Sequence, residues 1–239
     1  MKRPVRLGML TPSSNTTLEP ATYRMLSGLP DVTAHFGRFK VTEIALSDAA
    51  LGQFDDSEIL RAAELLAHAK VDCIAWNGTS AAWLGFDRDE RLVKRIKAAT
   101  GIKACTTVLS YREIFRRDSH KRIGLVTPYI DDVQARIVSN WAAAGFKVTA
   151  ECHLGIQDNF SFAEVDEATT ERMVREVAAG GVDCVAIVCT NVNGAAVSAR
   201  LERELGVPIL DSVAVTLWAS LRAAGVDPSS VKGWGQVFG

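Results

Sequence analysis

The feature that most constrains this 239-residue sequence is an internal repeat. Three pairs of segments match in the same order along the chain: residues 6–12 with 122–128, 71–80 with 182–191, and 100–106 with 205–211. Ordered self-similarity of this kind indicates that one supersecondary unit occurs twice. The chain is therefore expected to form two related units of about 110 residues each, a length typical of small domains.

Within each unit, short β-branched runs alternate with longer amphipathic stretches. The runs predict strands at 5–10, 32–36, 71–76, 102–105, 122–126, 147–152, 184–188 and 208–210, and helical periodicity is clearest at 57–69 and 169–179. Strands that alternate with helices favour parallel sheets covered on both faces. We therefore predict an α/β protein of two pseudo-symmetric, three-layer αβα domains with parallel four-stranded sheets.

A charged stretch at 112–121 marks the junction between the two units. The predicted N-terminal half spans residues 1–115 and is joined by the C-terminal segment 213–239, and the C-terminal half spans 116–212. Two copies of one fold usually pack about a pseudo-two-fold axis. Turns of equivalent sequence then face each other, so the active site is expected in the cleft between the domains.

Charge and cysteine content exclude several classes of partner. The chain carries 27 basic and 28 acidic residues, a balance that argues against nucleic acid or an anionic membrane as a partner. No run approaches the roughly 18 apolar residues of a membrane helix. Five cysteines without C-x-x-C spacing favour free thiols in a reducing cytoplasm. The sequence leaves homo-oligomerisation open.

Ligands of open α/β sheets bind beyond the carboxyl ends of the strands, so the strand-end turns are the places to seek chemistry. Cys189 ends one strand just before a helix expected near 193–194, and a helix N-terminus lowers a thiol pKa. The equivalent turn of the first unit is Gly78-Thr79-Ser80. Its hydroxyls and amides can bind a carboxylate, or they can simply cap a helix.

Other turns add polar candidates. Tyr129 follows a strand and can donate to an oxyanion, whereas Asn15 and Asn159 lie in polar turns for which ordinary turn chemistry is an alternative. The four histidines lack metal-ligand spacing, and no G-x-G-x-x-G, Walker or G-x-S-x-G pattern is present. The expected chemistry is thiol-based and uses no cofactor and no metal.

The sequence resembles the aspartate/glutamate racemase superfamily, in particular its branch of arylmalonate decarboxylases and maleate cis–trans isomerases. Short segments in the right order carry the resemblance: Gly78-Thr-Ser80, Cys105-Thr-Thr107, Tyr129-Ile-Asp-Asp132, Cys189, Leu205-Gly-Val-Pro208 and Gly233-Trp-Gly-Gln-Val-Phe238. Racemases and maleate isomerases of this superfamily have a cysteine at both turns. Here only the second turn has one, an arrangement that resembles the arylmalonate decarboxylases.

That resemblance implies a reaction and a role for each residue. Thr79, Ser80, Tyr129 and the backbone at Cys189–Thr190 would hold one carboxylate of a substituted malonate, and Cys189 would protonate the enediolate left when carbon dioxide departs. Donors placed where charge develops stabilise such an intermediate, each by roughly 3–4 kcal/mol. A single thiol delivers its proton to one face, so one enantiomer is expected.

Several residues depart from the decarboxylase pattern. The turn Ser13-Ser14-Asn15 and Asn159 resemble the isomerase branch, Asn77 replaces an apolar residue, and Thr190-Asn191 replace glycines. The alternatives are therefore an isomerase or racemase of a small dicarboxylate or amino-acid derivative, and a non-catalytic binder of small acids. In each case the expected partner is a small-molecule carboxylate.

Overall fold

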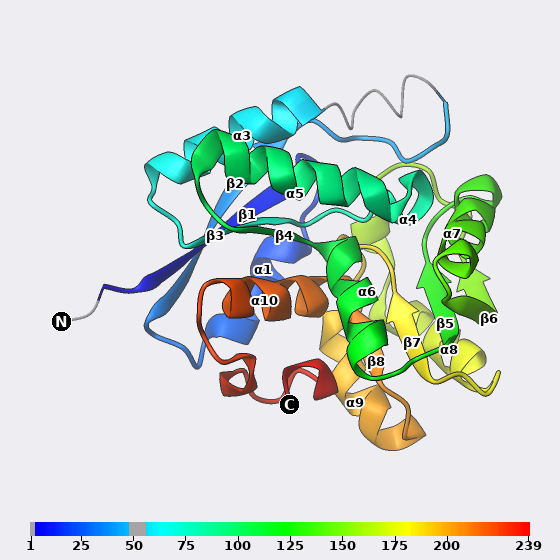
Figure 1. Cartoon of the computed structure of the whole chain (residues 1–239). Coiled ribbons are helices and arrows are strands. Elements are labelled where there is room, and N and C mark those ends of the chain that lie inside the picture. Colours follow the sequence, from blue (N-terminus) through cyan, green and yellow to red (C-terminus); the bar gives the residue numbers. More distant parts are fainter. Residues whose placement is uncertain (1–2, 48–55) are drawn as a thin grey trace.

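The computed structural model describes residues 3–47 and 56–239 (Figure 1). Within these residues the chain forms two parallel four-stranded sheets. The first has the order β2-β1-β3-β4, with strands β1 (Val5–Pro12), β2 (Val32–Phe39), β3 (Cys73–Trp76) and β4 (Ala104–Thr106). The second has the equivalent order β6-β5-β7-β8, with strands β5 (Arg122–Thr127), β6 (Lys147–His153), β7 (Cys184–Ile187) and β8 (Ile209–Asp211).

Helices cover both faces of each sheet (Figure 1). On the first sheet, α3 (Asp56–His68) and α5 (Phe86–Thr100) pack together on one face, whereas α1 (Leu18–Leu26) and α10 (Ser212–Ala223) pack together on the other. On the second sheet, α8 (Glu167–Ala178) and α9 (Ala195–Leu205) form one layer, and α7 (Asp131–Ala143) packs against β6. The predicted α/β fold with two four-stranded parallel sheets is confirmed.

The remaining elements are short, apart from α6 (Thr107–Arg117). They are α4 (Ala81–Leu84) and the 3₁₀ turns η1 (Ser161–Glu164), η2 (Pro228–Ser230) and η3 (Gln236–Phe238). The charged stretch expected as a junction is largely helical, because α6 continues to Arg117. Tyr111, Ile114 and Phe115 are buried at helical spacing, and their burial stabilises this segment as a helix.

The two sheets exchange helices. Helix α10 follows β8 of the second sheet but packs on β3 and β4 of the first. Helix α6 follows β4 of the first sheet, and its Tyr111 hydroxyl donates to the carbonyl oxygens of Ile187 (2.7 Å) and Leu210 (3.1 Å) in the second. Each half therefore supplies a helix to the other, and the two pack as one body.

The repeat is visible in the packing of two equivalent glycines. A Cβ atom on Gly8 would lie 3.0 Å from Val71 Cγ2 and 3.2 Å from the Cys73 carbonyl oxygen. On Gly124 it would lie 2.5 Å from Val177 Cγ1 and 3.3 Å from the Cys184 carbonyl oxygen. Both glycines therefore lie where an added side chain would meet close neighbours, more closely at Gly124 than at Gly8.

All eight predicted strands occur within the described residues, with ends that differ by at most three positions. The division of the chain at residues 115 and 212 stays a prediction, although α10 contacts the first sheet as that prediction requires. Across residues 3–47 and 56–239, no helix has the length and apolar character needed to cross a bilayer.

Candidate active site

The turns that follow β1, β3, β5 and β7 meet between the two sheets and surround a small cavity. Seven of the eight predicted site residues line it: Gly78, Thr79, Ser80, Tyr129, Asn159, Cys189 and Thr190. The cavity is also lined by Pro12, Val41, Ile44, Trp76 and Trp83. Its free volume is about 20 Å³, room for about one water molecule. A ligand as large as a dicarboxylate therefore enters only if the wall moves.

Cys189 places its thiol in the wall of this cavity. Its side chain is 3% exposed, and its Sγ atom accepts a hydrogen bond from the Asn191 amide at 3.4 Å. Burial raises the pKa of the thiol to about 12, against the opposing effect of the Asn191 amide and the Tyr129 hydroxyl. The thiol is therefore protonated at neutral pH, as a proton donor must be.

The expectation that a helix N-terminus would lower this pKa is wrong. Helix α9 begins at Ala195 and not immediately after Cys189, so its N-terminal amides lie beyond the turn. The influence of a helix terminus falls off within its first turn, and desolvation of the buried thiolate dominates instead.

Thr79 and Tyr129 form a hydroxyl pair across the two halves. Thr79 Oγ1 and the Tyr129 hydroxyl lie 2.6 Å apart, and both side chains are buried. Burial raises the pKa of Tyr129 well above its usual value, so the phenol keeps its proton. Edge-on contacts with Trp83 (5.3 Å between ring centroids) and Phe162 (5.5 Å) hold the Tyr129 ring in place.

Ser80 does not act as a side-chain cap in the turn before α4. Ser80 precedes α4, but its hydroxyl makes no capping hydrogen bond. In the part of the chain that the structure describes, the amides of Thr79, Ser80 and Thr190 make no hydrogen bond to the protein. Free amides beside buried hydroxyls form a preorganised pocket for a carboxylate.

Thr190 connects the two halves through hydrogen bonds of its side chain. Its hydroxyl donates to the Asn77 carbonyl oxygen at 3.1 Å and accepts from Asn15 Nδ2 at 3.1 Å. Asn15 Oδ1 in turn accepts from the amides of Thr17 and Leu18 at the start of α1. The eighth predicted residue, Asn15, thus lies behind the cavity and orients Thr190, and it is not a lining residue.

Two loops from opposite halves close the cavity. The loop after β2 and the loop after β6 pair through the bridge between Glu43 and Asp158, and the Asn159 amide donates to the Thr42 carbonyl oxygen at 3.0 Å. Asn159 Nδ2 also donates to Ser14 Oγ at 2.7 Å. Val41 and Ile44 of the first loop form an apolar part of the wall. Asn159 therefore lies in the cover of the cavity.

The place equivalent to Cys189 in the first half is filled by an indole. A Cβ atom on Gly78 would lie 1.9 Å from Cζ2 of Trp76, the last residue of β3. The indole itself is held by Phe39, 5.1 Å away between ring centroids. A side chain at position 78 therefore requires Trp76 to move, and the first turn presents hydroxyls and amides in place of a second thiol.

The described lining residues include no charged side chain. A bound carboxylate would be held by neutral hydroxyl and amide donors in a site with little water, where such hydrogen bonds are strong. A search of the same residues for three or more His, Cys, Asp or Glu side chains that could hold a metal ion finds none.

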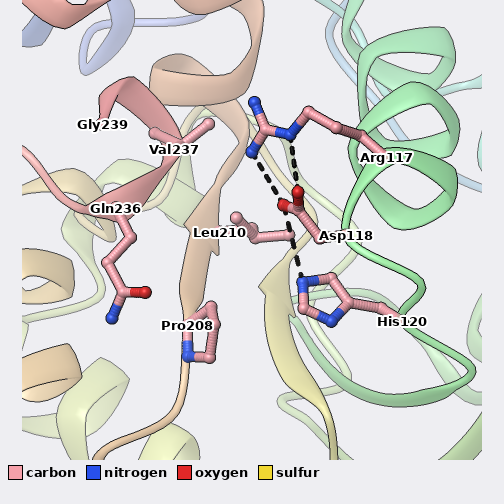
Figure 2. A pocket seen from close by; sticks show the side chains of 8 residues that line it. All are labelled: Arg117, Asp118, His120, Pro208, Leu210, Gln236, Val237 and Gly239. Atoms are coloured by element: carbon pink, nitrogen blue, oxygen red, sulfur yellow. Dashed lines mark hydrogen bonds and ion pairs between the residues drawn. The ribbon is translucent and has the colours of Figure 1, made fainter.

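A larger cavity of about 390 Å³ lies elsewhere, between the end of α6, the start of β8 and the C-terminal turn (Figure 2). Its charged residues already pair with one another. The Arg117 guanidinium contacts both carboxylate oxygens of Asp118 at 2.7 Å, and His120 Nε2 lies 3.8 Å from Asp118. This cavity opens at the amino end of β8, opposite the strand ends that carry ligands in this class of sheet.

Sequence reasoning missed the apolar part of the wall. Trp76 is recognisable as the end of a strand, but nothing local indicates that its ring folds back over Gly78. Val41 and Ile44 follow a strand without any motif. Their role depends on contact with the loop at Asn159, more than 100 residues away.

Comparison with known proteins identifies the family of this chain. The family model described as arylmalonate decarboxylase matches residues 7–238. A maleate isomerase of Pseudomonas putida KT2440 is 28% identical over 237 residues, 93% of each chain. An arylmalonate decarboxylase of Bordetella bronchiseptica is 27% identical over 235 residues, 97% of this chain and 95% of that one.

In three dimensions the chain is similar to the maleate isomerase of Pseudomonas putida S16, with a TM-score of 0.90 at 22% identity. The match covers 99% of this chain and 98% of the other. This likeness shows the fold, and the family model extends over nearly the whole sequence. The chain belongs to the arylmalonate decarboxylase family, whose relatives include both decarboxylases and maleate isomerases.

Proposed function

We propose that this protein is a cofactor-independent decarboxylase of a substituted malonate or a similar dicarboxylate. Thr79, Ser80 and Tyr129 hold the retained carboxylate, together with the free amides of the two turns. Cys189 is the proton donor. The proposal rests on one observation above all: a single protonated thiol faces a cluster of neutral donors, and Trp76 occupies the space where a second thiol would lie.

The proposed reaction balances without a co-reactant. The bond between the α-carbon and the departing carboxylate breaks, carbon dioxide leaves, and its bonding electrons pass into an enediolate on the retained carboxylate. The Cys189 thiol then gives its proton to the α-carbon, which yields a monocarboxylate and a thiolate. The thiolate regains a proton from solvent, so each turnover consumes one proton.

The donor arrangement suits the charge that develops. The enediolate carries more negative charge on its oxygens than the bound carboxylate does, so donors fixed around those oxygens bind the intermediate more tightly than the substrate. Tyr129 is buried and protonated, and its partner Thr79 fixes its hydroxyl at 2.6 Å. An apolar wall of Val41, Ile44 and Trp76 suits the departure of carbon dioxide.

A cis–trans isomerase of a small dicarboxylate is the second candidate. The observation in its favour is Asn159, which lines the cavity and bonds Ser14 from the opposite half. The similarity to maleate isomerases supports it as well. An isomerase at this site would rely on Cys189 without a thiol from the first turn.

Proton NMR in deuterated buffer separates the candidates. The purified chain would be incubated with dimethylmalonate, methyl(phenyl)malonate and maleate. We expect a malonate to disappear as a singly deuterated monoacid forms. Conversion of maleate to fumarate, or deuterium in an intact acid, would establish the isomerase or racemase reaction instead. Thermal stabilisation by an acid that undergoes no reaction would identify a binder.

Cys189→Ala is the decisive variant, and Cys184→Ala is its matched control. Cys184 is buried in β7, the strand that precedes Cys189, but does not line the cavity. Loss of a general acid typically slows a reaction by about 10²–10⁴-fold, so that loss is expected for Cys189→Ala alone. Turnover by Cys189→Ala at close to the native rate would refute the role of this thiol.

A further inference from the structure

A buried carboxyl group lies behind the turn that carries Cys189. Asp211 is the last residue of β8, beside β7, and its side chain is fully buried. Its Oδ1 atom accepts hydrogen bonds from the amides of Val213 (2.8 Å) and Ala214 (3.1 Å) at the start of α10. Oδ2 has no hydrogen-bond partner among residues 3–47 and 56–239.

The unpartnered oxygen points at a glycine. A Cβ atom on Gly194, which directly precedes α9, would lie 2.5 Å from Asp211 Oδ2. Because Oδ1 accepts two amide hydrogens, the proton of a neutral Asp211 belongs on Oδ2. The glycine makes room for that oxygen between the turn after β7 and the start of α9.

The first half also buries a carboxyl at the equivalent place, but this carboxyl comes from a helix and not from the end of a strand. Thr106 ends β4 as Asp211 ends β8, and Asp89 on α5 corresponds to Gly194 in the repeat. Asp89 is 1% exposed. Burial raises the pKa of Asp89, and the nearby Thr106 hydroxyl opposes this effect. Within the described residues, neither carboxyl oxygen of Asp89 has a hydrogen-bond partner. Each half thus buries one carboxyl behind the turn that follows its third strand.

The two carboxyls differ in what lies in front of them. Asp211 lies behind the turn of Cys189, and a negative charge on Asp211 raises the pKa of that thiol. Asp89 lies behind the turn of Gly78, which has no side chain. A charge on the buried carboxyl would therefore change the pKa of a thiol, Cys189, in the second half. In the first half the equivalent position is Gly78, which has no thiol.

We propose that Asp211 is a positioning residue for the proton donor: as a neutral carboxyl it keeps negative charge out of the space behind Cys189, so that a thiolate can form there. The inference rests on the proposed role of Cys189 as the donor. When Cys189 gives up its proton, a negative charge appears in a buried site. An ionised Asp211 would oppose that charge, and a neutral one does not.

The other ionisable groups around Asp211 are neutral or already paired. From β7 and its turn these are the thiols of Cys184 and Cys189, and from α6 it is the phenol of Tyr111, whose pKa is raised well above normal by burial. From α9, the Glu202 carboxylate accepts from the amides of Ile209 and Gln236. Burial raises the pKa of Asp211 itself to about 7, so the carboxyl is mostly neutral below that pH.

The test compares Asp211→Asn with Asp89→Asn. Asparagine keeps the capping oxygen but cannot ionise, so it mimics the neutral acid. The rate at which iodoacetamide alkylates Cys189 would be followed from pH 6 to 10 by peptide mass spectrometry, with Cys152 of the same chain as the internal reference. We expect Asp211→Asn to accelerate alkylation of Cys189 by about three- to tenfold above pH 8, because an ionised neighbour has been removed. Asp89→Asn is expected to match the native protein.

Turnover gives the second readout. Above pH 7 the kcat of the native protein is expected to fall to a plateau about tenfold lower as Asp211 ionises, whereas that of Asp211→Asn stays within about twofold. Equal alkylation profiles for native protein and Asp211→Asn, or an equal shift in Asp89→Asn, would overturn the inference. Alkylation needs no turnover, so a failed decarboxylase assignment is distinguished from a failed role for Asp211. If Asp211→Asn does not fold, Asp211→Ser keeps a capping hydroxyl and replaces it in both assays.

Discussion

The two turns that face each other in the cavity are copies that differ at one decisive position. Both contain a threonine whose hydroxyl is bonded by a residue of the opposite half: Thr79 by Tyr129, and Thr190 by Asn15. The residue that precedes the threonine in the sequence differs between the turns: it is Gly78 in the first and Cys189 in the second. The repeat therefore supplies a symmetric frame in which the second turn carries a thiol and the first does not.

The hydrogen-bond partners of the two threonines lie in different places relative to the cavity. Tyr129 lines the cavity, so its hydroxyl pair with Thr79 faces the space that a ligand would occupy. Asn15 lies behind the cavity, and Thr190 donates onward to a backbone oxygen. The two equivalent threonines thus have different partners: Thr79 pairs with a residue that lines the cavity, and Thr190 pairs with one that does not.

Thr79→Val against Thr190→Val tests that division and has the largest expected effect. Loss of one donor to a developing oxyanion costs about 10²–10³ in kcat, so Thr79→Val is expected to fall in that range. Thr190→Val removes two hydrogen bonds between the halves and is expected to lower the free energy of unfolding by about 1–3 kcal/mol while kcat changes less than about tenfold. Steady-state kinetics and urea unfolding measure the two effects. Equal losses of kcat would show that both turns bind the reacting group.

Asp89→Asn is expected to stabilise the protein at neutral and alkaline pH. Burial raises the pKa of this carboxyl from 3.8 to about 7, so between these values the unfolded chain ionises while the folded one keeps its proton. Stability due to this group is therefore full below pH 4 and is lost as pH rises toward 7, by up to about 4 kcal/mol. Urea unfolding at pH 5 and pH 8 measures it, with the exposed Asp31→Asn as control. No gain for Asp89→Asn at pH 8 would mean that the carboxyl has a partner.

Gly78→Ala tests whether Trp76 closes the first turn. The added methyl meets the indole at 1.9 Å, and overpacking of this kind typically costs about 1–3 kcal/mol. Activity is expected to fall as well, because the ring also lines the cavity. Combining Gly78→Ala with Trp76→Leu is expected to restore most of the lost stability. Gly28→Ala, with open space around its Cβ position, is the control. Additive losses in the double variant would contradict the clash.

Gly124→Ala and Gly8→Ala compare the packing of the two halves and have the smallest expected effects. The new methyl would meet Val177 at 2.5 Å in the second half but Val71 only at 3.0 Å in the first. We expect a loss of about 1–3 kcal/mol for Gly124→Ala and about 1 kcal/mol or less for Gly8→Ala. Thermal unfolding with both variants side by side measures this. A larger loss for Gly8→Ala would show that the first sheet is the more tightly packed.

Much of the site could be predicted because it lies at the ends of repeated strands. A strand that ends in Gly78-Thr79-Ser80 and another that ends in Cys189-Thr190 must bring those residues to the same edges of two parallel sheets. Strand ends are set by local turn chemistry, so Tyr129 could be placed in the same way. Asn15 could be placed at its turn, but its direction away from the cavity depends on a partner 175 residues away.

The sequence by itself determined the doubled α/β architecture, the positions of the strands along the chain and the single thiol between two strand-end turns, because these follow from periodicity, repetition and residue type. Tertiary structure alone decided how Trp76 covers Gly78 and how the loops at Val41 and Asn159 close the cavity. It also decided that α6 and α10 each contact the sheet of the opposite half. It also decided the state of the Cys189 thiol and the Asp211 carboxyl. Their pKa values depend on burial and on neighbours from distant elements, and no local pattern contains that information.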